Sequence, residues 1–263
     1  MSNDLLAPLD VKLMNLTSQA LLLGFVLLVL GAGGRWLVQQ PMFAIRGITV
    51  LGDISHTNAL VLRTQAAPQL KGTFFTLDLG AAQRAFESVP WVRKAIVQRE
   101  FPNRLRVLLQ EHQAVAYWGD EANSTLVNSY GEVFEANLGE IEQDALPRLD
   151  GPPEKSAQIL AMYRALTPLL QAQNLTVDEL TLSRRGNWQL QLDGGAMLEL
   201  GGGDADEVMA RLQRFLGTVG QVAARHGRNL SALEAADLRY GQGYALRLRG
   251  VSTLAPHSPG KKS

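Results

Sequence analysis

Residues 13–34 contain no charged side chain, and no other stretch of this chain is as long without one. Its centre, residues 20–30, reads Ala-Leu-Leu-Leu-Gly-Phe-Val-Leu-Leu-Val-Leu. About 20 apolar residues in a helix cross the hydrocarbon core of a bilayer, where the backbone must be helical because no water satisfies its polar groups. The run predicts one membrane-spanning helix over residues 16–38, preceded by a short tail at 1–15 and followed by a water-soluble body.

A cleaved signal peptide is the alternative for this run, since residues 31–33 are small enough for a cleavage site. A signal peptide has an apolar region of only about 7 to 15 residues after a basic start. Here the apolar run is longer, and Lys12 is the only basic side chain before it. Trp36, just after the run, suits the membrane interface of a retained helix. We therefore favour an anchor. Lys12 on one side and Arg35 and Arg46 on the other leave its orientation undecided by charge.

The composition narrows the classes of function. Lys and Arg number 25, and Asp and Glu also number 25, so the chain lacks the basic excess of a nucleic-acid-binding protein. The absence of cysteine excludes disulfides, thiol catalysis and thiolate metal sites. The residues beyond the span suffice for one large domain or two small ones.

The first part of the body has turn and stop residues that divide it clearly. Pro68 and Pro90 each end a run of helical spacing, and Phe101-Pro-Asn-Arg104 has the composition of a tight turn. β-Branched and alternating segments lie on either side of this helical region. The expected elements are a strand at 43–51, a helix from 57 or 58 to 67, a helix from 77 to 89, and strands at 91–100 and 105–111.

The second part, from residue 112, has shorter strands and two amphipathic helices. Trp188-Gln-Leu-Gln-Leu-Asp193 alternates apolar and polar residues, and Gly194-Gly195 predicts a hairpin. Pro168 is expected to kink or end the first helix, and Asp204 to cap the second. The expected elements are strands at 114–118, 124–128 and 131–135, a rigid connector at 146–153, a helix around 159–170, the hairpin 188–200, a helix from 205, and strands at 236–240 and 244–249.

Two groups of residues carry a resemblance to a known family. Residues 89–111, with their place in the strand-helix-helix-strand-strand order, resemble a POTRA module. Residues 183–192, the Leu-Gly-Gly-Gly-Asp at 200–204 and Asp-Leu-Arg-Tyr at 237–240 are similar, in order and spacing, to the FtsQ/DivIB family of bacterial division proteins. The resemblance covers residues 15–250.

The resemblance implies an α+β architecture. It consists of a cytoplasmic tail at 1–15, a transmembrane helix at 16–38, a β-α-α-β-β POTRA domain at 43–111, and at 112–250 a C-terminal β domain, a mixed sheet with helices packed on it. The segment 251–263 is rich in Pro, Ser, Gly and Lys and is expected to be a disordered tail.

No constellation of residues predicts an enzyme, a metal site or a cofactor. The glycines at 201–203 suggest a phosphate cradle, but Asp206 replaces the third glycine of a dinucleotide motif, and acidic residues follow where a phosphate would lie. A simple helix start with Asp204 and Glu207 is the better interpretation. The histidines form no pair at metal-ligand spacing.

The remaining class of function is binding of a partner protein, and two features of the sequence could provide a binding site. Arg184 and Arg185 are either solvated turn charges or a docking site for acidic side chains, which the guanidinium fork suits. The last strands place Arg239, Arg247 and Arg249 on one face, and a strand at the end of a chain often lies at a sheet edge. That edge is either blunted by its charges or open to a partner strand.

The resemblance assigns partners and residues to these features. It implies that the C-terminal strand region receives the periplasmic part of FtsB, itself paired with FtsL. Other divisome proteins (FtsI, FtsW, FtsK and FtsN) are expected partners too. The expected partner-binding residues are Arg184, Arg185, Arg239, Tyr240, Gln242, Gly243, Tyr244 and Leu248.

Two functions are therefore weighed. The first is a non-enzymatic, single-pass division scaffold of the bacterial inner membrane, with its body in the periplasm at the septum. It would recruit FtsB–FtsL and regulate septal wall synthesis. The second is a membrane-tethered POTRA chaperone or transport accessory for outer-membrane proteins, which predicts repeated POTRA units or a β-barrel. The single POTRA-like segment favours the first.

Overall fold

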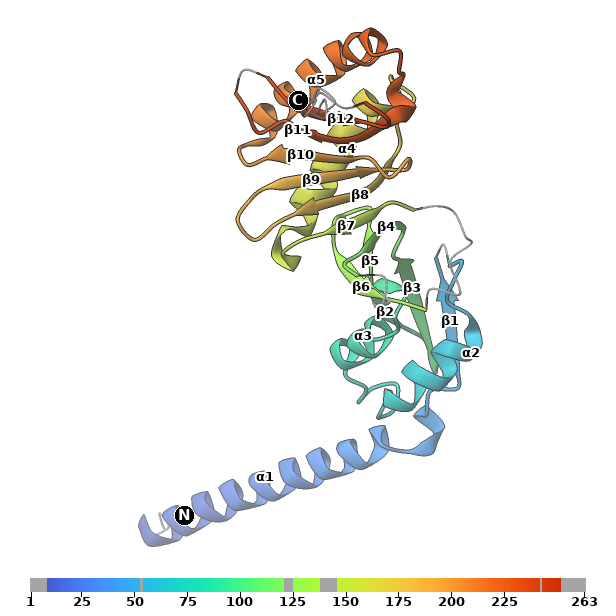
Figure 1. The fold of residues 1–263 in the computed structure, drawn as a ribbon. Coiled ribbons are helices and arrows are strands. Elements are labelled where there is room, and N and C mark those ends of the chain that lie inside the picture. The colour runs from blue at the N-terminus through green and yellow to red at the C-terminus, as the bar shows by residue number, and fades with distance from the viewer. Residues whose placement is uncertain (1–8, 53, 121–124, 138–145, 242, 252–263) are drawn as a thin grey trace, which may run out of the picture. The chain divides into compact units, whose positions relative to one another are not determined.

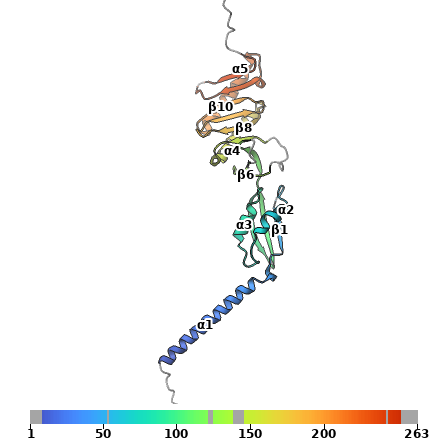
Figure 2. The ribbon, with the colours of Figure 1, turned by 60° about the horizontal axis from the view of Figure 1, so that its bottom comes forward.

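The computed structural model describes residues 9–52, 54–120, 125–137, 146–241 and 243–251. The chain divides into two compact units, an N-terminal unit, Met1–Glu111, and a C-terminal unit, His112–Ser263 (Figures 1 and 2). Each unit has a hydrophobic core of its own. Apart from Val251, the tail predicted to be disordered lies outside the described residues.

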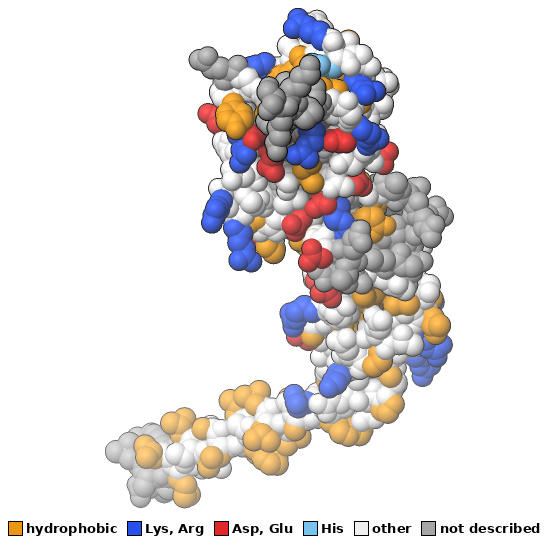
Figure 3. Space-filling model, in the orientation of Figure 1, with side chains coloured by type: hydrophobic (Ala, Val, Ile, Leu, Met, Phe, Trp, Pro, Cys, Tyr) orange, Lys and Arg blue, Asp and Glu red, His pale blue; other side chains and the backbone are white. Residues whose placement is uncertain are grey.

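The apolar run forms helix α1, Leu9–Val38. At 1.5 Å per residue, its 30 residues extend about 45 Å, more than the hydrocarbon thickness of a bilayer. From Leu13 to Val38 the mean hydropathy reaches 2.0, and no side chain in that window is buried. Hydrophobic side chains follow the helix along its length (Figure 3). This helix has the length and composition to cross a membrane, as the sequence predicted.

The rest of the N-terminal unit is a three-stranded sheet with helices on one side, which confirms the predicted β-α-α-β-β order. The sheet order is β1-β3-β2, with β1 parallel and β2 antiparallel to β3. The elements are β1, Gly47–Leu51; α2, Ala59–Val61, which continues as a π-helical turn, Leu62–Ala66, and a 3-10 turn, Ala67–Gln69; α3, Leu79–Glu87; β2, Val92–Glu100; and β3, Arg104–Glu111.

Side-chain caps explain where both helices begin. Asn58 accepts a hydrogen bond from the Val61 N–H at 2.9 Å, and Asp78 accepts from the Gly80 and Ala81 N–H groups. The first helix was predicted to stop before Pro68, but the chain stays helical through Gln69 as a 3-10 turn. Proline is tolerated there because its missing N–H falls in the first turn of that short segment.

Glu111, the last residue of β3, holds the loop after β1 in place. Its carboxylate accepts backbone N–H groups from Ser55 at 2.9 Å, His56 at 3.0 Å and Thr57 at 2.6 Å. The His56 ring lies 3.4 Å from the same carboxylate and stacks on Trp91. Burial alone would raise the pKa of Glu111, but the hydrogen bonds outweigh it and hold the pKa below its usual value of 4.5.

Glu111→Gln is expected to destabilise the N-terminal unit by about 1–3 kcal/mol at pH 7. Both carboxylate oxygens of Glu111 accept N–H groups, whereas the amide nitrogen of glutamine cannot accept a hydrogen bond. The lowered pKa means that the ionised carboxylate stabilises the fold above about pH 4.5, its unfolded value, and that this stabilisation is lost as the pH falls through the lower folded value. The unfolding temperatures of the unchanged chain and of Glu111→Gln, measured from pH 7 to pH 3, should become more similar as the pH falls. Glu100→Gln, which loosens only the exposed pair with Arg106, should have little effect.

The C-terminal unit is built on one nine-stranded mixed sheet, in the order β12-β11-β10-β9-β8-β7-β4-β5-β6 (Figures 1 and 2). The pairs β4–β7, β7–β8 and β10–β11 are parallel and the others antiparallel. The strands are β4, Ala114–Trp118; β5, Thr125–Asn128; β6, Val133–Glu135; β7, Arg148–Asp150; β8, Val177–Leu182; β9, Trp188–Leu192; β10, Met197–Gly201; β11, Leu233–Asp237; and β12, Ala245–Leu248.

Two helices, α4, Ser156–Gln171, and α5, Ala205–Arg225, cover one face of this sheet. α4 contacts β7, β8 and α5, and α5 contacts β10. Asp204 accepts the Glu207 N–H at 2.9 Å, so the glycine-rich segment is a capped helix start, as predicted. α4 continues three residues past Pro168 to Gln171, so the proline does not end the helix at its own position.

Two strands were not predicted. The expected rigid connector at 146–153 contains β7, a strand too short to show alternation. The sequence of β8 gave no clear pattern either, because its adjacent Asp178 and Glu179 interrupt the period. Both strands pair on both sides within the sheet, so tertiary pairing rather than local pattern makes them strands.

Candidate functional site

The final strand, β12, lies at one edge of the sheet, where the sequence suggested an edge strand. In the described part of the chain it pairs with β11 alone, in an antiparallel register that joins Ala236 to Leu246. The Arg249 N–H donates to the Ala232 carbonyl at 2.8 Å. Since backbone groups alternate sides along a strand, the N–H groups of Leu246 and Leu248 point away from β11. This side of β12 offers backbone donors and acceptors to another strand.

The side chains of β12 divide between core and solvent. Leu248 is buried in the core at 5% exposure, so only its backbone is available at the edge. Ala245 and Arg247 are exposed, and Leu246 is half-buried. Arg249, just beyond the strand, lies 3.6 Å from Glu234.

β11 ends earlier than predicted, at Asp237 rather than Tyr240. The Asp237 carboxylate accepts the Arg239 N–H at 3.1 Å, and this local bond turns the backbone out of the strand. Consequently Tyr240, expected on the apolar face with Leu238, is 59% exposed, while Leu238 remains buried. A large aromatic side chain is therefore exposed on the surface in the loop that leads to β12.

Arg239 is held by the same carboxylate. Its guanidinium donates to Asp237 Oδ1 at 2.9 Å from Nε and to Oδ2 at 2.6 Å from Nη2, a bidentate pair. The guanidinium lowers the pKa of Asp237, and the carboxylate raises the pKa of Arg239. Both side chains are partly exposed, so an acidic group of a partner can approach the remaining N–H donors of Arg239.

Gly201 makes room for Arg239. It has φ +79°, and a Cβ there would lie 2.9 Å from Arg239 Cγ and 3.0 Å from Arg211 Nη1. The neighbouring Gly202 carbonyl accepts a short hydrogen bond from the Arg211 guanidinium. Thus the glycine-rich segment before α5 lets an arginine stem cross the backbone.

The loop between β11 and β12 is fastened to α5. The Gly241 carbonyl accepts from Arg214 Nη1 at 2.8 Å, and the Tyr244 hydroxyl lies 2.9 Å from Thr218 Oγ1. The Tyr244 ring meets Phe215 edge to face at 5.0 Å. These α5 contacts were missed from the sequence, because their partners lie some 20 to 30 positions away along the chain. Gly243 is exposed, and Gln242 lies outside the described residues.

Arg184 and Arg185 occupy the turn between β8 and β9. The Gly186 N–H donates to the Ser183 carbonyl at 2.9 Å, and Gly186 has φ +81°, the arrangement of a tight turn closed by a left-handed glycine. Both arginines are exposed. In the described residues neither forms an ion pair, so both are available to an acidic partner.

The arginine turn and Arg239 lie at the same end of the sheet. A Cβ on Gly202 would lie 3.1 Å from Asn187 Oδ1 in the turn, while Gly201 touches Arg239. Two strand spacings, about 10 Å, separate β9 from β11. Arg184, Arg185 and Arg239, more than 50 positions apart in the sequence, are thereby brought together next to β12. We call these three arginines the basic rim.

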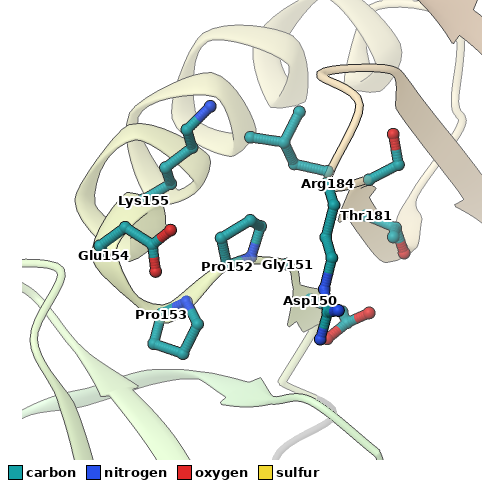
Figure 4. A pocket seen from close by; sticks show the side chains of 10 residues that line it. Asp150, Gly151, Pro152, Pro153, Glu154, Lys155, Thr181 and Arg184 are labelled. Atoms are coloured by element: carbon teal, nitrogen blue, oxygen red, sulfur yellow. The ribbon is translucent and has the colours of Figure 1, made fainter.

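A groove of about 640 Å³ adjoins the arginine turn (Figure 4). Arg184 lines it together with Asp150 and Lys155. The groove mixes charges of both signs and contains no histidine. Among the described residues no cluster of His, Asp and Glu could hold a metal ion.

Comparison with known proteins places the chain. The family description "Cell division protein FtsQ/DivIB, C-terminal" matches residues 116–239, and "POTRA domain, FtsQ-type" matches 43–112. The chain is 40% identical to the cell division protein FtsQ of Thiomonas arsenitoxydans, over 97% of this chain and 96% of that protein. It belongs to the FtsQ/DivIB family.

Other relatives agree with this assignment. The FtsQ of Burkholderia pseudomallei is 39% identical over 96% of this chain and 99% of its own length. The FtsQ of Bordetella pertussis is 35% identical over 96% and 97%. The family resemblance drawn from the sequence is therefore confirmed. As an FtsQ family member with one apolar N-terminal helix, the chain is a membrane-anchored protein of cell division.

Proposed function

We propose that this FtsQ family member is a non-catalytic, single-pass scaffold of the bacterial inner membrane, with its body in the periplasm at the division septum. It recruits the FtsB–FtsL subcomplex through β12 and the adjacent basic rim, and so regulates septal peptidoglycan synthesis. FtsI, FtsW, FtsK and FtsN are further divisome partners, for which the POTRA domain offers a second surface.

One observation carries the proposal: β12, which among the described residues pairs with β11 alone, lies next to three exposed arginines of the C-terminal unit. Strand addition at β12 supplies backbone hydrogen bonds, which give affinity but little selectivity. Arg184, Arg185 and Arg239 add selectivity, because a partner must present acids at matching positions. Tyr240, exposed beside them, has the size and rigidity of an interface anchor.

The alternative function, a tethered POTRA chaperone for outer-membrane proteins, has less support. It predicts several POTRA units in one chain, whereas the FtsQ-type POTRA match covers a single segment, 43–112. The same binding experiment separates the two functions.

Tyr240→Ala is expected to weaken binding of the periplasmic FtsB–FtsL segments by about 10- to 100-fold, because a central aromatic anchor contributes roughly 2 kcal/mol. Titration of the full chain in lipid nanodiscs by isothermal calorimetry measures this. Tyr130→Ala is the matched control, since Tyr130 is 57% exposed against 59% for Tyr240 and is in the turn between β5 and β6. The control should bind like the unchanged chain.

Three further variants test the backbone contribution and the charge contribution to binding separately. Leu246→Pro removes an N–H from the outer side of β12 and should weaken binding, whatever the partner's side chains. Arg184→Ala and Arg185→Ala, made singly, identify which arginine meets a partner acid. Equal affinity of Tyr240→Ala and Leu246→Pro with the unchanged chain would move the interface away from β12, and no binding by the unchanged chain would favour the chaperone function.

A further inference from the structure

An aromatic cluster at one end of the POTRA domain is exposed in a way that needs an explanation. Phe101, at the turn between β2 and β3, is 82% exposed, and Phe75 is 49% exposed. Rings connect them: Phe75 meets Phe74 at 5.2 Å, and Phe74 meets Phe101 at 6.4 Å, both edge to face. Phe43 extends the chain of rings, 5.0 Å from Phe75. We call these four residues the phenyl cluster.

The phenyl cluster is held firmly. The Phe74 N–H donates to the Phe43 carbonyl at 2.8 Å. Arg99 donates from Nε to the Phe74 carbonyl at 2.5 Å and from Nη2 to the Leu77 carbonyl at 2.7 Å. The exposed rings therefore do not belong to a loose loop, and water-facing phenyl groups fixed in this way mark a contact surface.

The position of the cluster along the chain identifies what it contacts. Phe43 follows Val38, the last residue of α1, by five residues, so it lies within about 18 Å of the end of the span. Thr73 Oγ1 donates to the Val38 carbonyl at 2.7 Å, which ties the loop before Phe74 to the end of α1. Since α1 is longer than the hydrocarbon core requires, its last turn reaches the headgroup layer.

The charges around the cluster fit a phospholipid surface. Arg35, Arg46 and Lys71 are exposed near it in sequence. The acidic residues nearest to its other members are already engaged: Asp78 caps α3, and Glu100 pairs with Arg106 at 3.0 Å. Basic side chains attract anionic headgroups, while aromatic and apolar groups enter the boundary between headgroups and acyl chains. Met42, 63% exposed beside Phe43, adds to the apolar surface.

We propose that the phenyl cluster docks onto the surface of the anionic bilayer that α1 crosses, and so fixes the POTRA domain against the membrane. Phe75 and Phe101 insert at the acyl boundary, and Arg46 and Lys71 contact lipid phosphates. The docking is independent of partner binding at β12, so either proposal can fail without the other.

The test uses the full chain, which has no cysteine of its own, in nanodiscs of phosphatidylethanolamine and phosphatidylglycerol. An environment-sensitive fluorophore is attached to Asn103→Cys, beside Phe101, and in a second protein to Lys94→Cys. Lys94 is on β2, six residues or about 20 Å from the end of that strand at Glu100, which precedes the turn with Phe101 and Asn103. Lipids with a quencher near the headgroup should quench the label at 103 several-fold more than the label at 94.

Phe75→Ser with Phe101→Ser should abolish this difference, and Leu108→Ser, which removes a 47% exposed leucine from β3, should preserve it. Hydrogen exchange of the POTRA core must be unchanged in each variant, which excludes unfolding as the cause. In nanodiscs of phosphatidylcholine the difference should shrink, because the basic groups then meet no net negative charge. Equal quenching at 103 and 94, or quenching at 103 that survives loss of both phenyl groups, overturns the proposal and leaves a protein partner as the occupant.

Discussion

Replacing Trp188 by alanine is expected to lower the free energy of unfolding of the C-terminal unit by about 3–5 kcal/mol. Trp188 is the first residue of β9, is 1% exposed, and pairs with Leu182 on one side and Gly201 on the other. It therefore joins the arginine turn to the segment that lies under Arg239. Removing it leaves a cavity where the two halves of the basic rim meet.

Hydrogen exchange of the full chain measures this effect locally. Amides of β8, β9 and β10 should exchange at least about 100-fold faster in Trp188→Ala, as a loss of about 3 kcal/mol requires. Trp188→Phe should recover part of the protection, since it fills part of the cavity. Trp36→Ala is the control, because Trp36 is 66% exposed on α1 and contributes nothing to this core. Unchanged protection in Trp188→Ala would mean that the sheet does not depend on this side chain.

Gly52→Ala is expected to destabilise the POTRA domain by about 3 kcal/mol or more. Gly52 has φ +130°, and a Cβ there would overlap the Leu109 carbonyl oxygen. Backbone atoms of β3 cannot move aside cheaply, so alanine must separate β1 from β3 as well as adopt a strained φ. Amides of β1 and β3 should lose protection by 100-fold or more, on the order expected for such a loss.

Gly47→Ala, at the first residue of β1, provides a control, since Gly52 directly follows the last residue of the same strand. A Cβ on Gly47 would meet only the flexible side chain of Arg104, at 3.2 Å from Nε, and the position needs no positive φ. Its effect should stay below about 1 kcal/mol. If both variants lost equal protection, the general cost of adding a side chain at either end of β1, rather than the contact with Leu109, would explain the result.

The local order of the chain could be predicted wherever one face or one residue type decided it. Asp204 caps α5 because its carboxylate accepts an N–H group of the first helical turn, and Trp188, Leu190 and Leu192 alternate with polar residues because a single face of β9 is buried. β7 and β8 were not predicted because pairing with a strand on each side, rather than their own residue pattern, makes them strands.

The candidate site shows the same division. The exposed arginines of the turn 183–187 and the final strand could be selected from residue type and position. Their convergence could not, since it depends on β8 to β11 lying side by side and on Gly201 giving room to Arg239. The end of β11 was misplaced because the hydrogen bond between the Arg239 N–H and Asp237 competes with the strand, and this bond brings Tyr240 to the surface.

The sequence by itself determined the apolar helix and the order of elements in the POTRA domain, because an uncharged run, proline stops and turn residues act over a few neighbouring positions. The family followed from the resemblance of its motifs in order and spacing. Only the tertiary structure decided which strand pairs with β12, that Arg184, Arg185 and Arg239 form one rim, and that four phenylalanines from distant segments form one cluster. These features depend on which strands pair, and pairing is set by burial of the whole sheet rather than by any local pattern.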